Sequence, residues 1–553
     1  MIRKHRNGKY LFLLVSAFLI LSLLFSLPLM RQEVIYSGDD LSYHIARLNE
    51  LYSNYKNGNF FVGISTFEFS KIGYPVTLFY PWVTLIPFIF LRILTGKAIV
   101  SIYLGISFYS FLTLFFTYVC TLKISRNKLQ SFITAIVYMF CSYRVIDIFP
   151  RFALGEFLAL TFLPLVFYGF YAIMFGNYND WPYLGLGLSF VMLSHILSTY
   201  ISVFVLGIFL IILFYWINDK KHCLLSLAKS IGLFVLSSAI FLFPFLEQER
   251  FQKFLPPSIN PLHSTELTLS NLVLQSLNNN LNGALTTSGS TYNIGIVLLI
   301  AIFIGFFQYK SWKLFYRVVF IFGIIITLFT TNIIPWLSLE HSVLKIIQFP
   351  WRFLGIASLM LSIIAGKEFI VVYNTNNIIR DKCCILAAMF ALIFIPWFSG
   401  IQTFKLQPEA RAIIYRYDNQ NLDGPLFLDQ YSPAVSQSKL GDNVNHVGLV
   451  NKNKTKFDVI SNINGLTLTA QGIRGTKVTL PVFDYKNIYV YDGAKKIKHT
   501  TDKYARIVVH NPKTNKLMVR FIPSFLDYVA IIISITTWIV CFAIYMVHKL
   551  KFL

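Results

Sequence analysis

The sequence is poor in charged residues, and this shortage decides the class of protein. Only 13% of its 553 residues are Asp, Glu, Lys or Arg, while 56% are hydrophobic. A soluble globular domain carries about 25% charged residues. The chain also repeats apolar runs of the length that a bilayer-spanning helix needs, about 20 residues. The composition therefore excludes an ordinary soluble protein and predicts a polytopic α-helical membrane protein.

Cysteine is scarce, and the long polar segments have none. The six cysteines all lie in or beside apolar runs. This distribution excludes a disulfide framework and a paired-cysteine metal motif. The sequence also has no P-loop, no Gly-rich nucleotide motif and no visible catalytic triad.

Acidic residues are few, and the excess of basic residues reports orientation. The chain has 48 Lys and Arg against 25 Asp and Glu, a net charge of +23, and much of this excess lies in short connectors. Such connectors face the cytoplasm in multi-pass proteins. We predict twelve spans, at residues 11–30, 98–120, 130–149, 155–175, 183–197, 199–217, 224–246, 292–308, 317–335, 350–373, 383–400 and 524–547.

This layout places every basic connector on one side of the membrane and both termini in the cytoplasm. The connectors are residues 1–9, 122–128, 218–222, 309–317, 378–382 and 548–552. Residues 82–95 would break the pattern if they formed a span. This run is short and contains a proline and an arginine, so we predict a re-entrant or juxtamembrane helix. The first apolar run is too long for a signal peptide and lacks a small-residue cleavage site, so we predict an uncleaved span.

Three polar regions should then face outward: loop 31–81, loop 247–291 and the block 401–523. The last of these alternates apolar and polar residues between turn residues, a pattern typical of β-strands. We predict a transmembrane domain over 1–400, an extracytoplasmic β-rich domain over 401–523, and a final helix and tail over 524–553. The β-rich block holds 18 Lys and Arg against 9 Asp and Glu. Such a charge suits an anionic partner or simply keeps the surface soluble.

The first outer loop begins with an unusually polar stretch, "YSGDDLSYHIARLNE" at residues 36–50. Asp39 is a good N-cap residue, so we expect a helix from there to about Asn57. On this helix Asp40, His44 and Arg47 are spaced by four and three residues and share one face.

Three interpretations of this stretch stay open. The aspartates can simply cap a helix, with Arg47 solvated. Alternatively, a carboxylate beside a histidine at the lipid–water boundary can act as a general base toward a hydroxyl. Two aspartates and a histidine are also ligands for a divalent cation, although the set is incomplete for a dedicated metal cage.

Five motifs in order resemble a known family. They are "GDDLSYHIARL", "GYPVTLFYP", "RFALGEFLALTFLPLVFYG", "LSHILSTYIS" and "FPWRFLGIASL". Together they resemble the bacterial YfhO-type proteins and the related membrane family labelled "6-pyruvoyl-tetrahydropterin synthase-related". The arrangement of a first span, an acidic outer loop, many spans and an outer C-terminal domain is similar to the GT-C class of membrane glycosyltransferases. The likeness covers most of residues 8–400.

The resemblance implies a function. GT-C enzymes transfer a sugar from a polyprenyl-phosphate donor to an acceptor at the outer face of the membrane, and an acidic residue of the first outer loop activates the acceptor. The family pattern resembles G-H-D-L-x-F-H-x-x-R, so it implies that Asp40 is the base and that His44 and Arg47 assist. Asp39 stands where the family often has histidine. The likeness further implies a bacterial cytoplasmic membrane and an envelope acceptor such as lipoteichoic acid.

Other charged residues at outer boundaries are candidates for substrate binding. Arg151 and Arg352 could meet a donor phosphate, or extend from a helix end to the lipid headgroups. Glu156 follows Arg151 by five residues, which is not a helical pairing distance. His195 has no partner in sequence, so a structural role is the simpler interpretation. A lipid-linked glycan transporter or flippase and a non-catalytic envelope-assembly protein remain alternatives, and no cofactor is implied with certainty.

Overall fold

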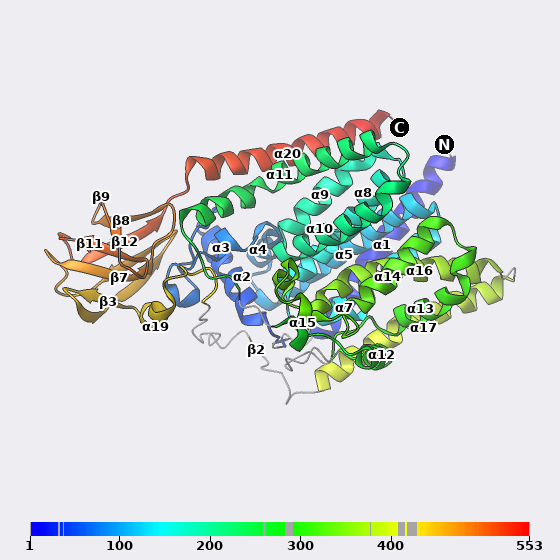
Figure 1. The fold of residues 1–553 in the computed structure, drawn as a ribbon, viewed down its shortest axis with the longest axis horizontal. Coiled ribbons are helices and arrows are strands. Elements are labelled where there is room, and N and C mark those ends of the chain that lie inside the picture. Colours follow the sequence, from blue (N-terminus) through cyan, green and yellow to red (C-terminus); the bar gives the residue numbers. More distant parts are fainter. Residues whose placement is uncertain are drawn as a thin grey trace. The chain divides into compact units, whose positions relative to one another are not determined.

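The computed structural model describes the chain except residues 1, 31–33, 37, 258–260, 282–290, 376–377, 407–414, 417–428 and 552–553. Within these described residues, eight helices are long and apolar enough to cross a membrane. They are α1 (Ile2–Met30), α5 (Ala98–Ser125), α8 (Leu154–Met174), α10 (Ile196–Leu213), α11 (Lys220–Phe251), α16 (Leu354–Thr375), α17 (Ile379–Leu406) and α20 (Phe525–Lys551). The prediction of a polytopic helical membrane protein is therefore confirmed (Figure 1).

One further helix pair, sharply bent, is either a broken span or a re-entrant loop. Helices α6 (Lys128–Phe140) and α7 (Ser142–Ile148) pass the same test together but are bent by 42°. The break falls at Cys141, whose backbone is extended. The side chain of Asn127 caps α6 by accepting the Gln130 N–H at 2.9 Å, as expected for an asparagine before a helix.

Each of the twelve predicted spans coincides with a helix, but the count of twelve spans is not confirmed. Three of the helices are short, namely α9 (Trp181–Met192), α13 (Ile296–Gln308) and α14 (Leu314–Leu328). Fifteen helical residues extend only about 22 Å, less than the roughly 30 Å of a hydrocarbon core. Residues 82–95 do form a short helical segment, η2 (Val83–Leu85) followed by α4 (Ile86–Thr95). Its place in a membrane stays a prediction.

The chain divides into two compact units. The first comprises residues 1–41, 97–232 and 259–419, and the second comprises residues 42–96, 233–258 and 420–553. The first unit is a helical bundle with a small antiparallel pair, β1 (Val34–Ile35) and β2 (Tyr415–Arg416). Short helices α12 (Leu269–Leu277) and α15 (Trp336–Leu339) lie in its connections.

Several basic connectors of the first unit lie at one end of its bundle. The Tyr10 hydroxyl on α1 lies 2.7 Å from that of Tyr118 near the end of α5. The Lys128 ammonium at the start of α6 lies 4.1 Å from the centre of the Tyr10 ring. Gln130 donates to the Tyr316 hydroxyl, at the start of α14, at 3.0 Å. Three of the six connectors that the sequence assigns to the cytoplasm, 1–9, 122–128 and 309–317, are thus close to one another.

The second unit contains the β-rich domain. Two five-stranded sheets, ordered β10-β11-β7-β3-β4 and β5-β6-β12-β8-β9, share one apolar core. The strands are β3 (Val447–Val450), β4 (Asn453–Lys456), β5 (Asp458–Asn462), β6 (Gly465–Thr469), β7 (Lys477–Phe483), β8 (Ile488–Asp492), β9 (Lys495–Ile497), β10 (Thr500–Thr501), β11 (Arg506–His510) and β12 (Lys516–Phe521). The β-rich character predicted for this region is confirmed, and the two sheets form a sandwich. Gly493, with φ 61°, makes the tight turn between β8 and β9.

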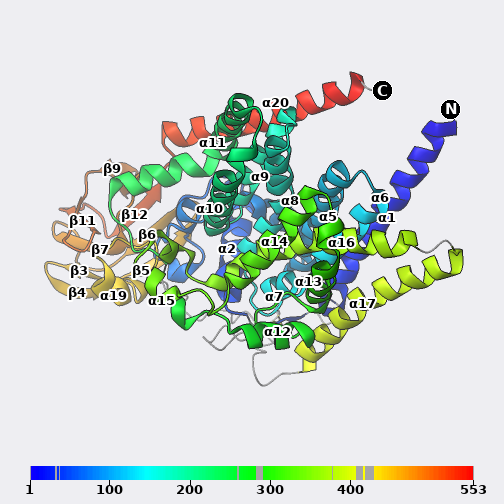
Figure 2. The same cartoon turned by 45° about the vertical axis from the view of Figure 1, so that its right-hand side comes forward.

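Helices α2 (Leu41–Lys56), α3 (Val76–Phe79) and α19 (Leu440–Val444) complete the second unit, which α2 enters just after Leu41. The final helix, α20, runs beside the second half of α11 in both views (Figures 1 and 2). Trp538 of α20 donates to the Ser237 hydroxyl of α11 at 2.7 Å.

Candidate active site

The predicted site residues Arg151, Glu156 and Arg352 meet in the first unit. Helix α7 ends at Ile148, and the Arg151 N–H then bonds the Ile146 carbonyl at 3.0 Å. Phe152 follows with a positive φ of 55°, and α8 begins at Leu154. This tight reversal brings the Arg151 guanidinium to 3.2 Å from the Glu156 carboxylate. The five-residue spacing works because Phe152 and Ala153 are not helical and Glu156 lies in the first turn of α8.

Glu156 is shared by two arginines. The Arg352 Nε lies 3.6 Å from Glu156 Oε2. Arg352 also donates from Nη1 to Gln348 Oε1 at 2.8 Å and to the Ile347 carbonyl at 3.2 Å. The side chains of Arg352 and Glu156 are almost completely buried. Neither arginine simply extends to the lipid headgroups, because Glu156 holds both of them.

The sequence analysis missed two members of this cluster, Asp147 and Tyr143. Asp147 accepts a hydrogen bond from Arg151, and the Tyr143 hydroxyl donates to Glu156. Asp147 is fully buried, and one of its carboxylate oxygens has no hydrogen-bond partner within the described residues. The sequence does carry a signal for Asp147, which lies inside the predicted span 130–149 in "YRVIDIF". Acidic residues within membrane spans are rare and often functional.

Aromatic rings hold Arg151 from another side. Its guanidinium lies 4.4 Å from the centre of the Trp351 ring, and Trp351 stacks on Tyr292 with ring centres 3.9 Å apart. Both rings are nearly fully buried. In "FPWRF" the sequence points to Arg352 as a candidate for substrate binding. The structure shows that the preceding residue, Trp351, also contributes, because it packs on the Arg151 guanidinium.

The backbone of Asp40 is hydrogen-bonded to the turn that carries Arg151. Its N–H donates to the carbonyl oxygen of Arg151 at 3.0 Å. A Cβ on Gly38 would lie 2.6 Å from backbone atoms of Arg151, so the glycine allows this close approach. The chain thus passes directly over the turn that carries Arg151.

The Asp40 carboxyl is half-buried. Burial raises its pKa, the negative charge of Glu156 adds to the rise, and Arg151 and Arg352 oppose it. A raised pKa suits a carboxylate that must take up and release a proton. Asp40 immediately precedes Leu41, the first residue of α2, so it occupies the N-cap position predicted for Asp39. Asp39 is exposed.

His44 and Arg47 lie on the part of α2 that belongs to the second unit. Arg47 Nη1 is 3.2 Å from His44 Nδ1, and its guanidinium lies 4.0 Å from the centre of the Tyr80 ring. Each residue is only 2% exposed. The interpretation of Arg47 as a solvated side chain is therefore wrong, because Arg47 donates to the Pro81 carbonyl and packs on aromatic rings.

His195 immediately precedes α10. Its Nδ1 lies 2.8 Å from the Ser198 hydroxyl, and the residue is buried. It also interacts electrostatically with Glu156. The contact with Ser198 agrees with the structural role predicted for this histidine. The interaction with Glu156 also places His195 near the cluster of Arg151, Glu156 and Arg352.

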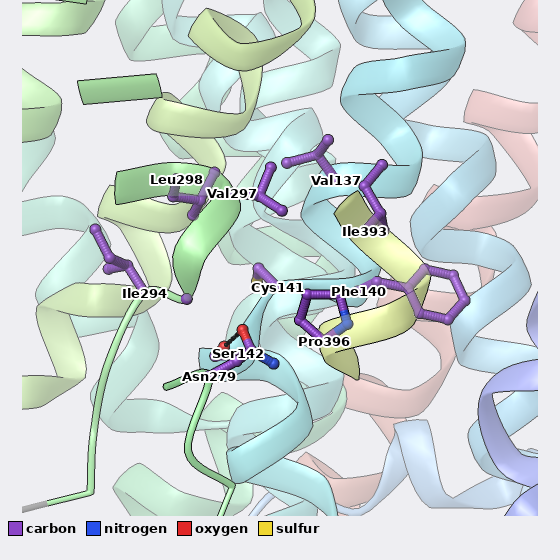
Figure 3. Close-up of a pocket in the computed structure, with 11 residues that line it drawn as sticks. Val137, Phe140, Cys141, Ser142, Asn279, Ile294, Val297, Leu298, Ile393 and Pro396 are labelled. Atoms are coloured by element: carbon purple, nitrogen blue, oxygen red, sulfur yellow. Dashed lines mark hydrogen bonds between the residues drawn. The ribbon is translucent and has the colours of Figure 1, made fainter. Parts of the chain in front are cut away.

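A small pocket opens at the break between α6 and α7 (Figure 3). Most of its lining is apolar, and the Ser142 hydroxyl donates to Asn279 Oδ1 at 2.7 Å. Gly295 closes the same corner, since a Cβ there would lie 2.4 Å from the Ser142 oxygen. Among the residues that the structure describes, no group of three or more His, Cys, Asp or Glu could hold a metal ion.

No protein-family model matches the chain, and no curated protein matches it by sequence. Several solved structures resemble it, among them the following three. Arabinofuranosyltransferase AftD from Mycobacteria is 13% identical over 71% of this chain and 27% of its own, with a TM-score of 0.43. ArnT from Cupriavidus metallidurans, bound to undecaprenyl phosphate, is 10% identical over 66% and 60%, with a TM-score of 0.37. The oligosaccharyltransferase from Archaeoglobus fulgidus is 10% identical over 70% and 56%, with a TM-score of 0.40. The chain therefore spans less than two thirds of the length of each of these proteins.

Proposed function

We propose that this protein is a membrane glycosyltransferase of the GT-C type. It would move a sugar from a polyprenyl-phosphate donor to a cell-envelope acceptor, a lipoteichoic acid or similar glycopolymer, at the outer face of a bacterial cytoplasmic membrane. The observation that carries the proposal is the position of Asp40. Its carboxyl group is half-buried, its backbone N–H is bound to the Arg151 carbonyl, and the buried guanidinium groups of Arg151 and Arg352 meet at Glu156. The resemblance of the motif around Asp40 to the family pattern supports the same assignment.

In this reaction Asp40 acts as the general base. It takes the proton from the acceptor hydroxyl, whose oxygen attacks the anomeric carbon of the donor sugar. The bond from that carbon to the phosphate oxygen breaks, and the polyprenyl phosphate leaves with the electron pair. Arg151 and Arg352 supply positive charge for the leaving phosphate. Glu156 and Asp147 orient these guanidinium groups, while His44, Arg47 and Asp39 assist from α2 and its start.

The orientation follows from the basic connectors. Because several of them gather at one end of the first unit, the positive-inside rule assigns that end and the N-terminus to the cytoplasm, and the basic residues 548–552 assign the C-terminus to the same side. Asp40, Arg151 and Arg352 lie beyond the opposite ends of their helices, since α1 and α7 precede the first two and α16 follows the third. A lipid-linked donor and the hydrophilic chain of an envelope polymer can meet at such a boundary.

The test is compositional. The gene is deleted in its host and restored with the wild type, with Asp40→Asn or with Asp458→Asn, an exposed aspartate of the β-sandwich that serves as control. Sugars on envelope polymers and lipids are then measured by mass spectrometry, after equal membrane levels are verified. We expect a sugar that is lost on deletion, returns with the wild type and with Asp458→Asn, and stays absent with Asp40→Asn. Full restoration by Asp40→Asn would remove Asp40 as the base.

A transporter or flippase of lipid-linked glycans is the second candidate. The observation that favours it is Glu368, a carboxylate buried within the spanning helix α16, with one oxygen that has no hydrogen-bond partner among the described residues. Buried carboxylates of this kind mark transport pathways in many membrane proteins. Purified protein in detergent separates the two functions. A transferase converts donor and acceptor there, whereas a flippase needs a closed bilayer.

A further inference from the structure

One face of the β-sandwich presents tyrosine rings to solvent. In β8, Ile488 and Val490 point into the shared core. Successive residues of a strand face opposite sides of a sheet, so Tyr489 and Tyr491 point outward. Both tyrosines are half-exposed. Being two residues apart on one strand, their rings stand about 7 Å from each other.

Basic side chains surround these rings. Arg520 of β12 pairs with Tyr489 in the sheet, and Lys496 of β9 pairs with Tyr491. The Lys496 ammonium lies 3.4 Å from the centre of the Tyr489 ring. Lys516 lies on the same side of β12, and all three basic residues are exposed. We call Tyr489, Tyr491, Lys496, Lys516 and Arg520 the tyrosine face.

Negative charge does not balance this surface. The structure describes every residue of this sheet. Among its outward-facing positions, Asp458 at the start of the edge strand β5 is the one exposed acidic residue. Asp492, at the end of β8, already accepts hydrogen bonds from the backbone N–H groups of Lys513 and Thr514. The tyrosine face therefore has an excess of positive charge that is available to an anionic partner.

We infer that the tyrosine face binds a phosphate-bearing glycan. The flat Tyr491 ring offers an apolar surface on which a sugar ring can stack, whereas the Lys496 ammonium covers one face of Tyr489. The hydroxyls of both tyrosines can hydrogen-bond to sugar hydroxyls. Arginine binds phosphate through two parallel hydrogen bonds, and lysine adds charge. The alternation of rings and cations along the face matches a polymer that alternates sugars and phosphates. The inference rests on the proposed function only where it identifies this glycan with the acceptor.

The composition of the face favours a glycan over a membrane surface. A surface that binds lipid presents several large apolar side chains beside its basic residues, and these enter the headgroup region. Among the outward-facing positions of this sheet, all of them described, one large aliphatic side chain is exposed, that of Ile460 at 59%. Met518 is half-buried. The aromatic residues are tyrosines, whose hydroxyls suit a hydrated partner.

The full-length protein in detergent provides the test. Binding of a lipid-free poly(hexose phosphate), which alternates sugar rings and phosphates, is measured by microscale thermophoresis, with neutral dextran of similar length and phosphatidylglycerol vesicles as the other two probes. The variants are Lys496→Gln/Arg520→Gln and Tyr491→Ala. The control, Lys456→Gln/Lys477→Gln, removes the same charge from exposed positions of the other sheet. Thermal unfolding verifies that all variants fold equally.

We expect the Lys496→Gln/Arg520→Gln variant to weaken polymer binding at least about tenfold, because charge-assisted contacts to phosphate are strong. Tyr491→Ala should weaken it several-fold, and the control should change it little. Equal binding by wild type and variants would overturn the inference, and so would binding to vesicles without binding to the polymer. Asp40→Asn should bind the polymer normally. If no transfer is ever detected but the tyrosine face still governs polymer binding, the proposed function fails and this inference stands.

Discussion

The backbone N–H of Asp40 donates to the backbone carbonyl of Arg151 at 3.0 Å. This single bond fixes the start of α2 to the turn between α7 and α8. The turn carries the Arg151–Glu156 pair, and Arg352 completes it. The carboxyl group that we propose as the general base is thus held near two arginines by a main-chain hydrogen bond, which no side-chain substitution can remove directly.

Gly38 makes this bond available, so Gly38→Ala should reduce transferase activity by at least about tenfold, a cost of about 1.4 kcal/mol. The added methyl group would lie 2.6 Å from backbone atoms of Pro150 and Arg151, and backbone cannot move aside cheaply. Activity is measured with a polyprenyl-phosphate donor in detergent. Gly207→Ala is the matched control, because a Cβ there meets nothing within 4 Å. Normal activity in Gly38→Ala would show that the close approach is dispensable.

The pH dependence of transfer should report Asp40. A base is active when deprotonated, and burial raises the pKa of this carboxyl. The rate should therefore rise with pH through a midpoint above that of an ordinary aspartate, and Asp40→Asn should abolish that limb. Arg352 favours the charged form of Asp40, so Arg352→Gln should move the midpoint to higher pH. Arg352→Lys, which keeps the charge, should move it less. A midpoint that is the same in both variants would contradict the assignment.

The helices are predictable from the sequence because long apolar runs have few other solutions in a membrane. The sandwich is predictable because its strands alternate and glycine marks a hairpin. The ion pair between Arg151 and Glu156 cannot be predicted from the sequence in this way. It depends on Phe152 adopting a positive φ, which is rare for a bulky residue and leaves no sequence signal.

The bend at Cys141 escapes prediction for a similar reason, since neither proline nor glycine stands there. The sequence also suggests that Leu41, Ile45 and Leu48 form an apolar face that lies on the membrane. The structure buries all three inside the protein. Periodicity identifies an apolar face, but it does not distinguish lipid from protein as the partner.

Asp147 should matter for stability more than any surface acid. Its partner Arg151 is also buried, and breaking a buried ion pair costs about 3–5 kcal/mol. Asp147→Asn should therefore lower the unfolding temperature in detergent clearly. Asp180→Asn is the control, because its pair with Lys123 is partly exposed and such pairs contribute about 1 kcal/mol or less. Equal unfolding temperatures for the two variants would mean that the cluster does not stabilise the first unit.

Glu50 should control the order of the loop that follows α2. Its fully buried carboxylate accepts the backbone N–H groups of Thr66, Phe67 and Glu68 at 2.9–3.0 Å. The next three residues, 69–71, all have φ near 52°, a left-handed conformation that costs about 1–2 kcal/mol for each non-glycine residue.

The Glu50 contacts help to offset this cost, because hydrogen bonds to a charged group contribute about 1.5–3 kcal/mol each. The Lys71 side chain is already exposed, but trypsin also needs a backbone that can unfold into its cleft. Glu50→Ala should therefore release the loop and speed cleavage after Lys71, which mass spectrometry detects as a new product. Glu68→Ala is the control, since it removes a nearby carboxylate without removing those three contacts. Trypsin cleavage at Lys71 that is equally slow in the wild type and in Glu50→Ala would show that the left-handed turn is held by other contacts, such as the bond from His446 to the Ser70 carbonyl at 2.8 Å.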